Sequence, residues 1–329
     1  MKKAAFIIPY YGKFNNYFQL FLDSCSYNKD YDWIIFTDNI EEYDYPSNVS
    51  VYKTTFQEIC NYIASKFSFP IVIDKPYKLC DFKPAYGFIF QKYLTKYQFW
   101  GYCDVDLILG CLNNFISESD FLNYDKIGVL GHLTLIRNTE EVTNAFLKPL
   151  NGNLRAKEVY MNRKNCSFDE EFNKSINNIF EQYNYRIRYE EYEANIYTKS
   201  SNFKIVRLNP KTKKYEVESK KKSFFEWNKG ILQRYVMKNK AVDKEEYMYI
   251  HMQSRPMNIK SDLSFIRNMK RYKIIPNSFE LFEVDYIDYM NFEKIKKKYF
   301  NMHYFRLRTK NLIDKIKKKF EYINIDILG

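Results

Sequence analysis

Two aspartates stand two residues apart in the middle of an otherwise apolar stretch of the chain. The stretch, FWGYCDVDLILG over residues 99–110, carries Asp104 and Asp106. In a strand, residues i and i+2 point to the same face of the sheet, so these carboxylates are expected to converge at or near the end of a buried strand. Two carboxylates in apolar surroundings repel each other and lose hydration, and a bound cation compensates both costs. The pair therefore predicts a site for a hard divalent cation, Mg²⁺ or Mn²⁺, which prefers oxygen ligands and leaves positions for phosphate oxygens.

A histidine later in the chain fits the same kind of site. His251 ends an apolar run over residues 247–251 that is typical of a strand, and it stands four residues before Arg255. A neutral imidazole would join Asp104 and Asp106 as a third ligand of Mn²⁺ or Mg²⁺. Two alternatives stay open at this point: the aspartates form a solvated turn after a strand, and the histidine is a hydrogen-bonded structural group.

The composition excludes several other kinds of site. The 329 residues include six cysteines, none in a C-x-x-C pair, and three histidines without H-E-x-x-H spacing. These features predict reduced thiols in a cytoplasmic protein rather than a disulfide framework or a zinc site. The net charge of +12 accompanies many Lys, Asn, Ile, Tyr and Phe residues, a bias typical of A- and T-rich codons, so it is weak evidence for a partner. No apolar run approaches the roughly 20 residues of a membrane span.

The apolar pattern alternates between strand-like and helix-like segments. Besides the two runs already described, strands are expected over 4–8, 32–39, 49–52, 126–130 and 133–137, helices over 14–26, 56–67, 81–97 and 168–180, and an exposed hairpin or loop over 211–222. This alternation predicts an α/β domain with a mostly parallel central sheet and helices on both faces. Ligands of such sheets bind beyond the carboxyl ends of the strands, where Asp38, Asp104 and Asp106 fall.

Three common nucleotide and catalytic motifs are missing from the sequence. The phosphate loop G-x-x-x-x-G-K-[ST], the dinucleotide fingerprint G-x-G-x-x-G and the nucleophile elbow G-x-S-x-G do not occur. Their absence argues against a P-loop kinase, a dinucleotide-binding dehydrogenase and an α/β-hydrolase.

Seven short segments, taken in their order, carry a resemblance to a known class. They are IIPYY (7–11), IFTD (35–38), KLCDFKP (78–84), DVD (104–106), GHLTLIRN (131–138), FDEEFN (168–173) and IHMQSRPM (250–257). Together they resemble the GT-A class of nucleotide-sugar glycosyltransferases, most of all bacterial transferases of surface-polysaccharide synthesis. The resemblance implies a GT-A-like, Rossmann-type catalytic domain over residues 1–258 that binds a nucleoside-diphosphate sugar and an acceptor.

The resemblance also implies roles for individual residues. Asp104, Asp106 and His251 would hold the divalent metal, and Asp169 or Glu170 would be the catalytic carboxylate. The residues expected to bind substrate are Pro9, Tyr10, Tyr11, Asp38, Asp81, Lys83, His132, Arg137, Asn138 and Arg255. For each of these residues an alternative without function stays open: it caps a helix or turn, it is a structural group, or it is a surface charge. HMQSRPM replaces the H-x-x-G-x-x-K-P-W form of the class and D-E-E replaces D-Q-D, which leaves the donor sugar and the stereochemistry open.

The chain changes character from about Ser261 onward. Residues 259–329 are expected to form a basic helical extension in which apolar side chains interleave with Lys294, Arg306, Lys310 and the lysines of 315–319. Such a segment suits a helix on an anionic membrane surface nearly as well as a solvated basic cap. The membrane interpretation would place a cytoplasmic protein on the inner face of the membrane. Nucleic-acid binding is not expected, because no recognisable motif accompanies the charge.

The sequence therefore predicts a metal-dependent glycosyltransferase, with UDP as the expected nucleotide, that moves a sugar to a glycan or lipid-linked acceptor in surface polysaccharide or lipopolysaccharide synthesis. If the reaction inverts the anomeric carbon, a carboxylate is expected to act as general base on the acceptor hydroxyl. The alternative is a non-catalytic glycan- or nucleotide-binding protein on the same scaffold. A nucleic-acid-binding protein that uses the basic tail is the least favoured alternative.

Overall fold

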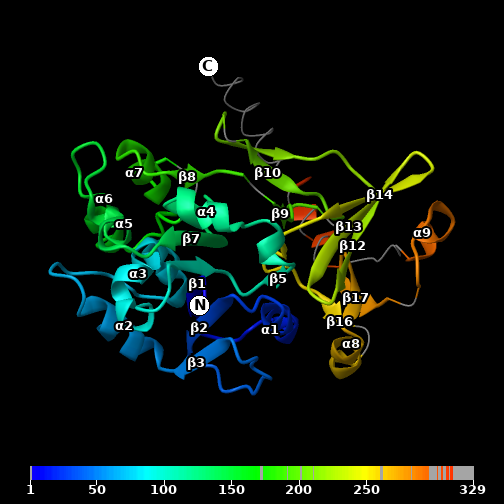
Figure 1. The fold of residues 1–329 in the computed structure, drawn as a ribbon, viewed down its shortest axis with the longest axis horizontal. Helices are drawn as coiled ribbons and strands as arrows, with labels where there is room; N and C mark the ends of the chain where they lie inside the picture. The colour runs from blue at the N-terminus through cyan, green and yellow to red at the C-terminus, as the bar shows by residue number, and fades with distance from the viewer. Residues whose placement is uncertain are drawn as a thin grey trace.

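The protein forms two lobes, each built around its own sheet (Figure 1). The computed structural model describes residues 2–170, 173–190, 192–200, 202–209, 211–259, 262–282, 284–295, 302, 305–306, 309–310 and 312–313. The first lobe contains the N-terminal strands, and the second contains most of the chain after residue 222. A small three-stranded sheet lies between the two lobes and carries part of the candidate site.

The sheet of the first lobe contains seven described strands in the order β3-β2-β1-β4-β7-β6-β8. They are β1 (Ala4–Pro9), β2 (Tyr31–Thr37), β3 (Val49–Lys53), β4 (Phe99–Cys103), β6 (Lys126–Ile127), β7 (Leu133–Arg137) and β8 (Ile187–Arg188). Strands β3, β2, β1 and β4 run parallel, whereas β7 runs antiparallel to both β4 and β6. The α/β class is therefore confirmed, and the sheet is mixed.

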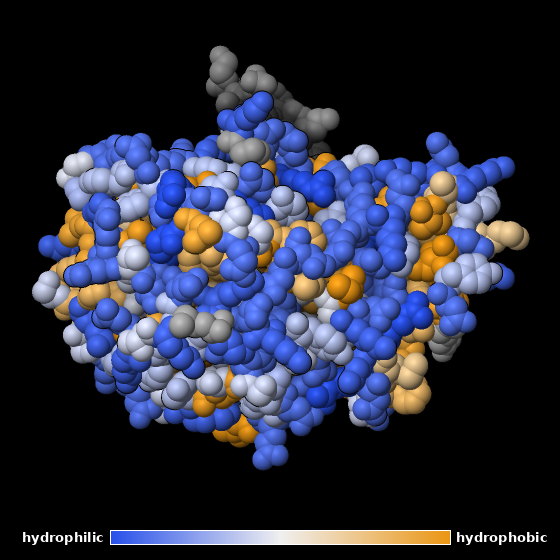
Figure 2. Space-filling model, in the orientation of Figure 1, coloured by the Kyte–Doolittle hydropathy of each residue, from blue (hydrophilic) through white to orange (hydrophobic). Residues whose placement is uncertain are grey.

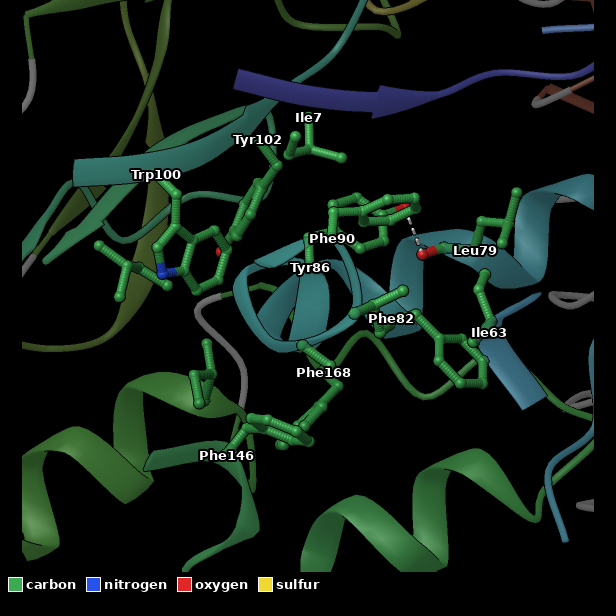
Figure 3. Packing of buried hydrophobic residues seen from close by; sticks show 14 of the residues in the cluster. Ile7, Ile63, Leu79, Phe82, Tyr86, Phe90, Trp100, Tyr102, Phe146 and Phe168 are labelled. Carbon is green, nitrogen blue, oxygen red and sulfur yellow. Dashed lines mark hydrogen bonds between the residues drawn. The ribbon is translucent and has the colours of Figure 1, made fainter. Parts of the chain in front are cut away.

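Helices cover both faces of this sheet. They are α1 (Phe18–Ser26), α2 (Phe56–Ala64), α3 (Tyr86–Ile89), α4 (Glu118–Asn123), α5 (Glu140–Thr143), α6 (Arg155–Tyr160) and α7 (Ile176–Gln182), with 3₁₀ helices η1 (Pro76–Ala85), η2 (Gln91–Tyr93), η3 (Leu112–Asn114) and η4 (Ala145–Leu147). Alternate residues of β1 point to opposite faces: Ile7 packs with the cluster under α2, α3 and α5–α7, and Phe6 packs with α1 and α4 (Figure 3). Because both faces are covered, β1 is apolar throughout, as strands in such sheets are.

The second lobe contains a six-stranded sheet in the order β14-β13-β12-β17-β18-β16. Its elements are β12 (Ser223–Asn228), β13 (Ile231–Lys238), β14 (Ala241–Glu246), β16 (Asn258–Ile259), β17 (Arg271–Ile275), β18 (Ser278–Leu281), α8 (Leu263–Met269) and α9 (Tyr289–Ile295). The predicted helical extension is wrong over residues 271–281, because β17 and β18 form a hairpin that pairs with β12. The basic residues Lys296–Lys298, Arg308 and those of 315–319 lie outside the described residues.

The small sheet joins β5 (Leu107–Leu109), β15 (Tyr249–His251) and β9 (Glu193–Asn195). A separate hairpin pairs β10 (Val206–Asn209) with β11 (Lys214–Val217), so the hairpin expected over 211–222 begins earlier than predicted. The helix expected over 81–97 is wrong in type: the chain there forms η1, one short α-helix and η2. Pro84 lies inside η1, and a proline lacks the amide that an α-helix needs there. The helix expected over 168–180 begins only at Ile176, after a capping box at Ser175.

The face of the protein in Figure 2 is mostly hydrophilic, and its apolar side chains occur in small separate groups. Within the described part of the chain, no helix is both long enough and apolar enough to cross a bilayer.

Candidate active site

A bend after β4 and the pairing of β15 with β5 bring the two aspartates and the histidine together. Strand β4 ends at Cys103, and Asp104, Val105 and Asp106 form the bend before β5, so the aspartates follow the strand rather than lie within it. Strand β15 pairs antiparallel with β5, and His251 lies opposite Leu107. This register places the imidazole directly beside the residue that precedes Leu107, which is Asp106.

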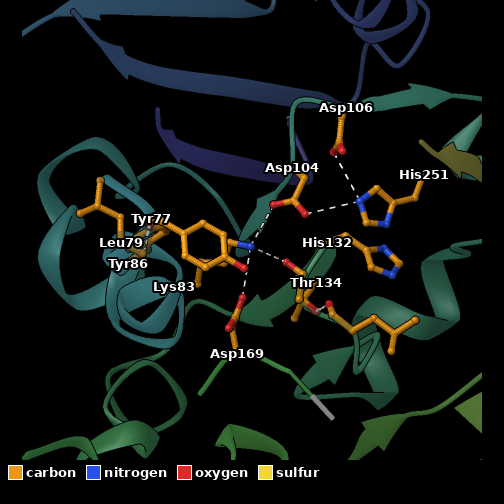
Figure 4. Close-up of polar contacts among 12 residues, drawn as sticks. Tyr77, Leu79, Lys83, Tyr86, Asp104, Asp106, His132, Thr134, Asp169 and His251 are labelled. Carbon is orange, nitrogen blue, oxygen red and sulfur yellow. Dashed lines mark hydrogen bonds and ion pairs between the residues drawn. The ribbon is translucent and has the colours of Figure 1, made fainter. Parts of the chain in front are cut away.

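The three side chains converge on a common point (Figure 4). Nε2 of His251 lies 3.4 Å from Oδ1 of Asp106 and 3.8 Å from Oδ2 of Asp104. Taking one ligand atom from each of the three residues, all three atoms lie within 4.8 Å of one another. The second oxygen of Asp106 accepts the backbone N–H of Ser254, which fixes the carboxylate and leaves its other oxygen toward the histidine.

The donor set fits a divalent cation. Two ligand atoms at right angles around one ion, each at about 2.1 Å, are about 3 Å apart, so the observed separations need only small side-chain rotations. Two carboxylate oxygens and an imidazole nitrogen suit Mn²⁺ or Mg²⁺. Burial would raise the pKa of Asp106, but the neighbouring His251 and the Ser254 amide outweigh it and hold the pKa below its ordinary value. Asp106 is therefore ionised at neutral pH, as a metal ligand must be.

A tight turn after β15 supports this arrangement. Gln253 and Ser254 both have left-handed backbone conformations, with φ of 56° and 51°. Such conformations cost about 1 kcal/mol or more for residues other than glycine. The side chain of Gln253 donates to Oδ1 of Asn195 at 2.6 Å, and the amide of Ser254 is directed at Asp106. The strained turn therefore orients a hydrogen bond to a candidate metal ligand.

Lys83 links this cluster to a second acidic group. Its Nζ lies 2.9 Å from Oδ1 of Asp104, 3.1 Å from Oδ2 of Asp169 and 2.8 Å from the carbonyl oxygen of Gly131. Burial would lower the pKa of Lys83, but the two carboxylates reverse this and hold the pKa well above its ordinary value. The lysine is thus a fixed positive charge between the candidate metal ligands and the predicted catalytic carboxylate.

Asp169 is an unusual carboxylic acid in this setting. Its side chain is almost fully buried, and burial raises its pKa to about 7 even though Lys83 acts in the opposite direction. The neighbouring Glu170 contributes to this rise. A carboxyl group that titrates near neutral pH can take up a proton during a reaction and release it afterwards, which is the property of a general base.

His132 lies behind the candidate ligands. Its ring packs against His251 with centroids 4.3 Å apart, and its Nδ1 is 2.8 Å from the hydroxyl of Tyr249. Burial lowers the pKa of His132 well below its ordinary value, so the ring is neutral. Nδ1 of His251 has no hydrogen-bond partner among the described residues. A metal-binding histidine commonly donates from that nitrogen to a carboxylate, a carbonyl or water, whereas the ring of His251 is packed against His132.

The cluster opens into a cavity of about 650 Å³. The predicted site residues that line it are Pro9, Tyr10, Tyr11, Asp81, Lys83, Asp104, Asp106, Asp169, Glu170 and His251. They come from the end of β1, from η1, from the bend after β4, from the segment before α7 and from the end of β15. The carboxyl ends of parallel strands β1 and β4 thus meet the cavity, as the strand order requires.

Two predicted substrate residues lie away from this cavity. Arg137 donates from Nε to Asp125 and from Nη2 to the carbonyl oxygen of Phe121, and Asn138 donates to the carbonyl oxygens of Leu94 and Tyr97. The reason is the direction of β7, which runs antiparallel to β4. Its first residues therefore lie near the cavity, whereas Arg137 and Asn138 lie at the opposite edge of the sheet.

Three others have structural contacts instead of a free side chain in the cavity. Arg255 donates to the carbonyl oxygens of Pro276 and Ser200, and it is 3% exposed. The exposed Asp38 accepts the amide of Gly12 at 3.0 Å, which anchors the loop after β1. Asp81 lines the cavity with its backbone segment, but its carboxylate is fully buried and is bound by Lys78 at 2.7 Å.

The comparisons with known proteins give one family match. A protein family described as a family of unknown function (DUF6625) matches residues 6–283. The chain belongs to the DUF6625 family. The match contains both sheets up to β18 and every candidate site residue, so the DUF6625 unit runs past the predicted domain boundary at residue 258. No curated protein and no solved structure matches the chain.

Several residues of the DUF6625 site were missed in the sequence. Ser254 binds Asp106, Lys78 binds Asp81, and Tyr77 lines the cavity beside them. Gly131 approaches the acidic pair so closely that a Cβ there would lie 2.7 Å from Oδ2 of Asp169. Of these, only Gly131 carried a signal, because a glycine before a strand can mark a close approach of the backbone.

Proposed function

We propose that the protein is a divalent-metal-dependent glycosyltransferase of the GT-A type, which moves a sugar from a nucleoside diphosphate to an acceptor hydroxyl. The observation that carries the proposal is the convergence of Asp104, Asp106 and His251, from segments 145 residues apart, on a cavity that also contains a buried lysine. Parallel strand ends, two carboxylates and an imidazole are the parts that such a reaction needs to hold a metal and a diphosphate.

The proposed division of labour follows the contacts. Asp104, Asp106 and His251 would hold the cation, which supplies Lewis-acid charge to the diphosphate when bound. Lys83 adds a permanent positive charge on the side of the cavity where Asp169 lies. Negative charge develops on the leaving diphosphate, so a fixed cation in a water-poor site stabilises the transition state more than the ground state.

We assign the base role to Asp169 of the two predicted catalytic carboxylates, because Lys83 contacts it and its pKa is raised toward neutrality. In an inverting reaction the bond from the anomeric carbon to the diphosphate oxygen breaks, and its electron pair leaves with the diphosphate. The acceptor oxygen forms the new bond, and its proton passes to Oδ1 or Oδ2 of Asp169. A pKa of about 7 suits this transfer at neutral pH. In a retaining reaction the diphosphate takes the proton, and Asp169 and Lys83 then serve to orient it.

Thermal unfolding with a panel of nucleoside diphosphates and their sugars, with and without Mn²⁺, tests the proposal. A ligand that binds only the native state raises the midpoint. We expect a shift that requires both Mn²⁺ and one nucleotide, with UDP as the first candidate, and loss of that shift in the Asp104→Asn/Asp106→Asn variant. A wild-type shift in the double variant would contradict the site assignment.

The matched control is Asp125→Asn, which changes an aspartate that binds Arg137 at the far edge of the sheet. Release of the sugar from the nucleotide that gives the shift then separates an enzyme from a binding protein. A metal-dependent nucleotide shift without turnover of any donor would favour the non-catalytic alternative. The acceptor, a glycan or a lipid-linked glycan in surface-polysaccharide synthesis, and the contact of the basic tail with an anionic membrane remain part of this proposal.

A further inference from the structure

An exposed tyrosine stands at the rim of the cavity. Tyr77 lines the cavity and is 68% exposed. It is the one described large apolar or aromatic side chain with more than a third of its surface exposed that borders this cavity. A single exposed aromatic side chain is ordinary on a protein surface, but aromatic rings that border a cavity with convergent polar groups are typical of ligand sites.

The ring lies on the side of the cavity that contains the predicted general base. Tyr77 is the second residue of η1, the same segment that supplies Lys83 (Figure 4). Tyr77, Asp169 and Glu170 line the same cavity. Partial burial, followed by the charges of Cys80, Glu170 and Asp169, raises the pKa of Tyr77. The cavity is also lined by Pro9, which ends β1, and by Tyr10, which follows it.

The backbone under this ring is held in place. The next residue, Lys78, is fully buried, and its Nζ binds Asp81 at 2.7 Å and the carbonyl oxygens of Val159 and Lys164 at 3.0 and 2.9 Å. The carbonyl oxygen of Tyr77 accepts the side-chain amide of Asn165 at 3.1 Å. The tyrosine is therefore an exposed ring on a rigid support, which is the arrangement that lowers the entropy cost of binding.

We infer that Tyr77 is the stacking platform for the acceptor, and that the acceptor is a pyranose ring. This inference rests on the proposed function, because it takes Asp169 as the group that accepts the proton of the acceptor hydroxyl. The C–H face of a pyranose packs on an aromatic ring, and the sugar hydroxyls then face the carboxylates of Asp169 and Glu170.

The probes are the methyl glycosides of glucose, galactose and mannose, each measured by saturation-transfer NMR with the full-length chain. We expect at least one of them to bind wild-type protein through its ring protons, with about tenfold weaker binding to Tyr77→Ala. Tyr77→Phe keeps the ring and is expected to keep binding. Tyr286→Ala removes a tyrosine that is 69% exposed in the second lobe, and it is expected to bind as wild type does.

Three results would overturn the inference. They are binding of no methyl glycoside to wild-type protein, equal binding by Tyr77→Ala, and loss of the Mn²⁺-dependent nucleotide shift in Tyr77→Ala. The last would make the ring a platform for the nucleobase instead. The glycoside measurement needs no nucleotide, so a missing nucleotide shift in wild-type protein would count against the proposed function, whereas a missing glycoside signal counts against the platform.

Discussion

The protonation of Asp169 should be visible as a pH dependence of stability. The Asp169→Asn substitution keeps the shape of the side chain and removes its titration. The pKa of Asp169 rises from 3.8 to about 7 in the folded protein. Burial is the main cause, because the carboxylate loses hydration that Lys83 replaces only in part. The folded state therefore binds the proton of Asp169 more tightly than the unfolded state does.

The sign and the size follow by linkage. The stabilisation due to the bound proton is complete below pH 3.8 and is lost as the pH rises through about 7. A difference of about three pH units corresponds to about 4 kcal/mol at 1.36 kcal/mol per unit. The free energy of unfolding of Asp169→Asn, relative to wild type, should thus increase by about 4 kcal/mol between pH 4 and pH 8, because the variant has no carboxylate to ionise there.

Urea unfolding of both proteins at several pH values between 4 and 8, with EDTA present to exclude metal, measures this difference. The control is Glu158→Gln, which changes a half-exposed carboxylate paired with Arg155. Its effect should stay below about 1 kcal/mol at each pH. A difference between Asp169→Asn and wild type that is flat with pH, or that favours wild type increasingly as the pH rises, would refute a raised pKa of Asp169 in the folded protein.

Two further predictions concern the residues that hold this carboxylate. Asp81→Asn leaves Lys78 buried without its carboxylate, so unfolding free energy should fall by about 3–5 kcal/mol in denaturant titrations; a loss under 1 kcal/mol would show that the pair is dispensable. Gly131→Ala places a Cβ 2.7 Å from Oδ2 of Asp169, so we expect a large loss of sugar transfer while the Mn²⁺-dependent thermal shift persists. Unchanged turnover in that variant would mean that Asp169 is not needed where the structure places it.

The part of the site that follows the parallel strands could be predicted from the sequence. The apolar runs of β1 and β2 and the helical spacing between them determine the strand direction, and Tyr10 and Asp104 then fall at one edge of the sheet. This holds because a helix between two strands brings the chain back to the same end of the sheet. Both lobes of the fold are within the matched family region, but only the first could be anticipated in outline.

The pairing of β7 with β4 could not be predicted in the same way. The connection from β6 to β7 spans only residues 128–132 and is too short for a parallel crossover, so β7 must reverse relative to β6. The sequence does not show that β7, rather than β6, pairs with β4. The hairpin reverses the strand, so Gly131 and His132 reach the site while Arg137 and Asn138 leave it. The direction of β7 thus determines which half of the GHLTLIRN segment (131–138) lies near the cavity.

The hairpins of the second lobe could not be recognised from the apolar pattern of the sequence. Lys229 and Gly230 connect β12 to β13 with φ of 46° and 86°, which is the geometry of a tight two-residue hairpin turn. Asn239, at φ of 46°, opens the next hairpin. Lysine is less typical of such a turn than asparagine, and the alternation in β14 is almost entirely polar, so neither hairpin stands out from the sequence.

Burial rather than residue type separates the two lysine–aspartate pairs of the site. Lys78 with Asp81 and Lys83 with Asp104 have the same chemistry, and both lysines come from the same 3₁₀ segment. The first pair is fully buried and also binds the backbone of residues 159–168, so it holds the loop that carries Asp169. The carboxylate of Asp104 is 34% exposed and faces His251, so it can change partners. The Lys78–Asp81 pair therefore supports the site, and the Lys83–Asp104 pair can bind a ligand, because only the second contacts solvent. Solvent contact depends on how the chain folds, so the K-x-x-D-x-K spacing of residues 78–83 does not reveal it.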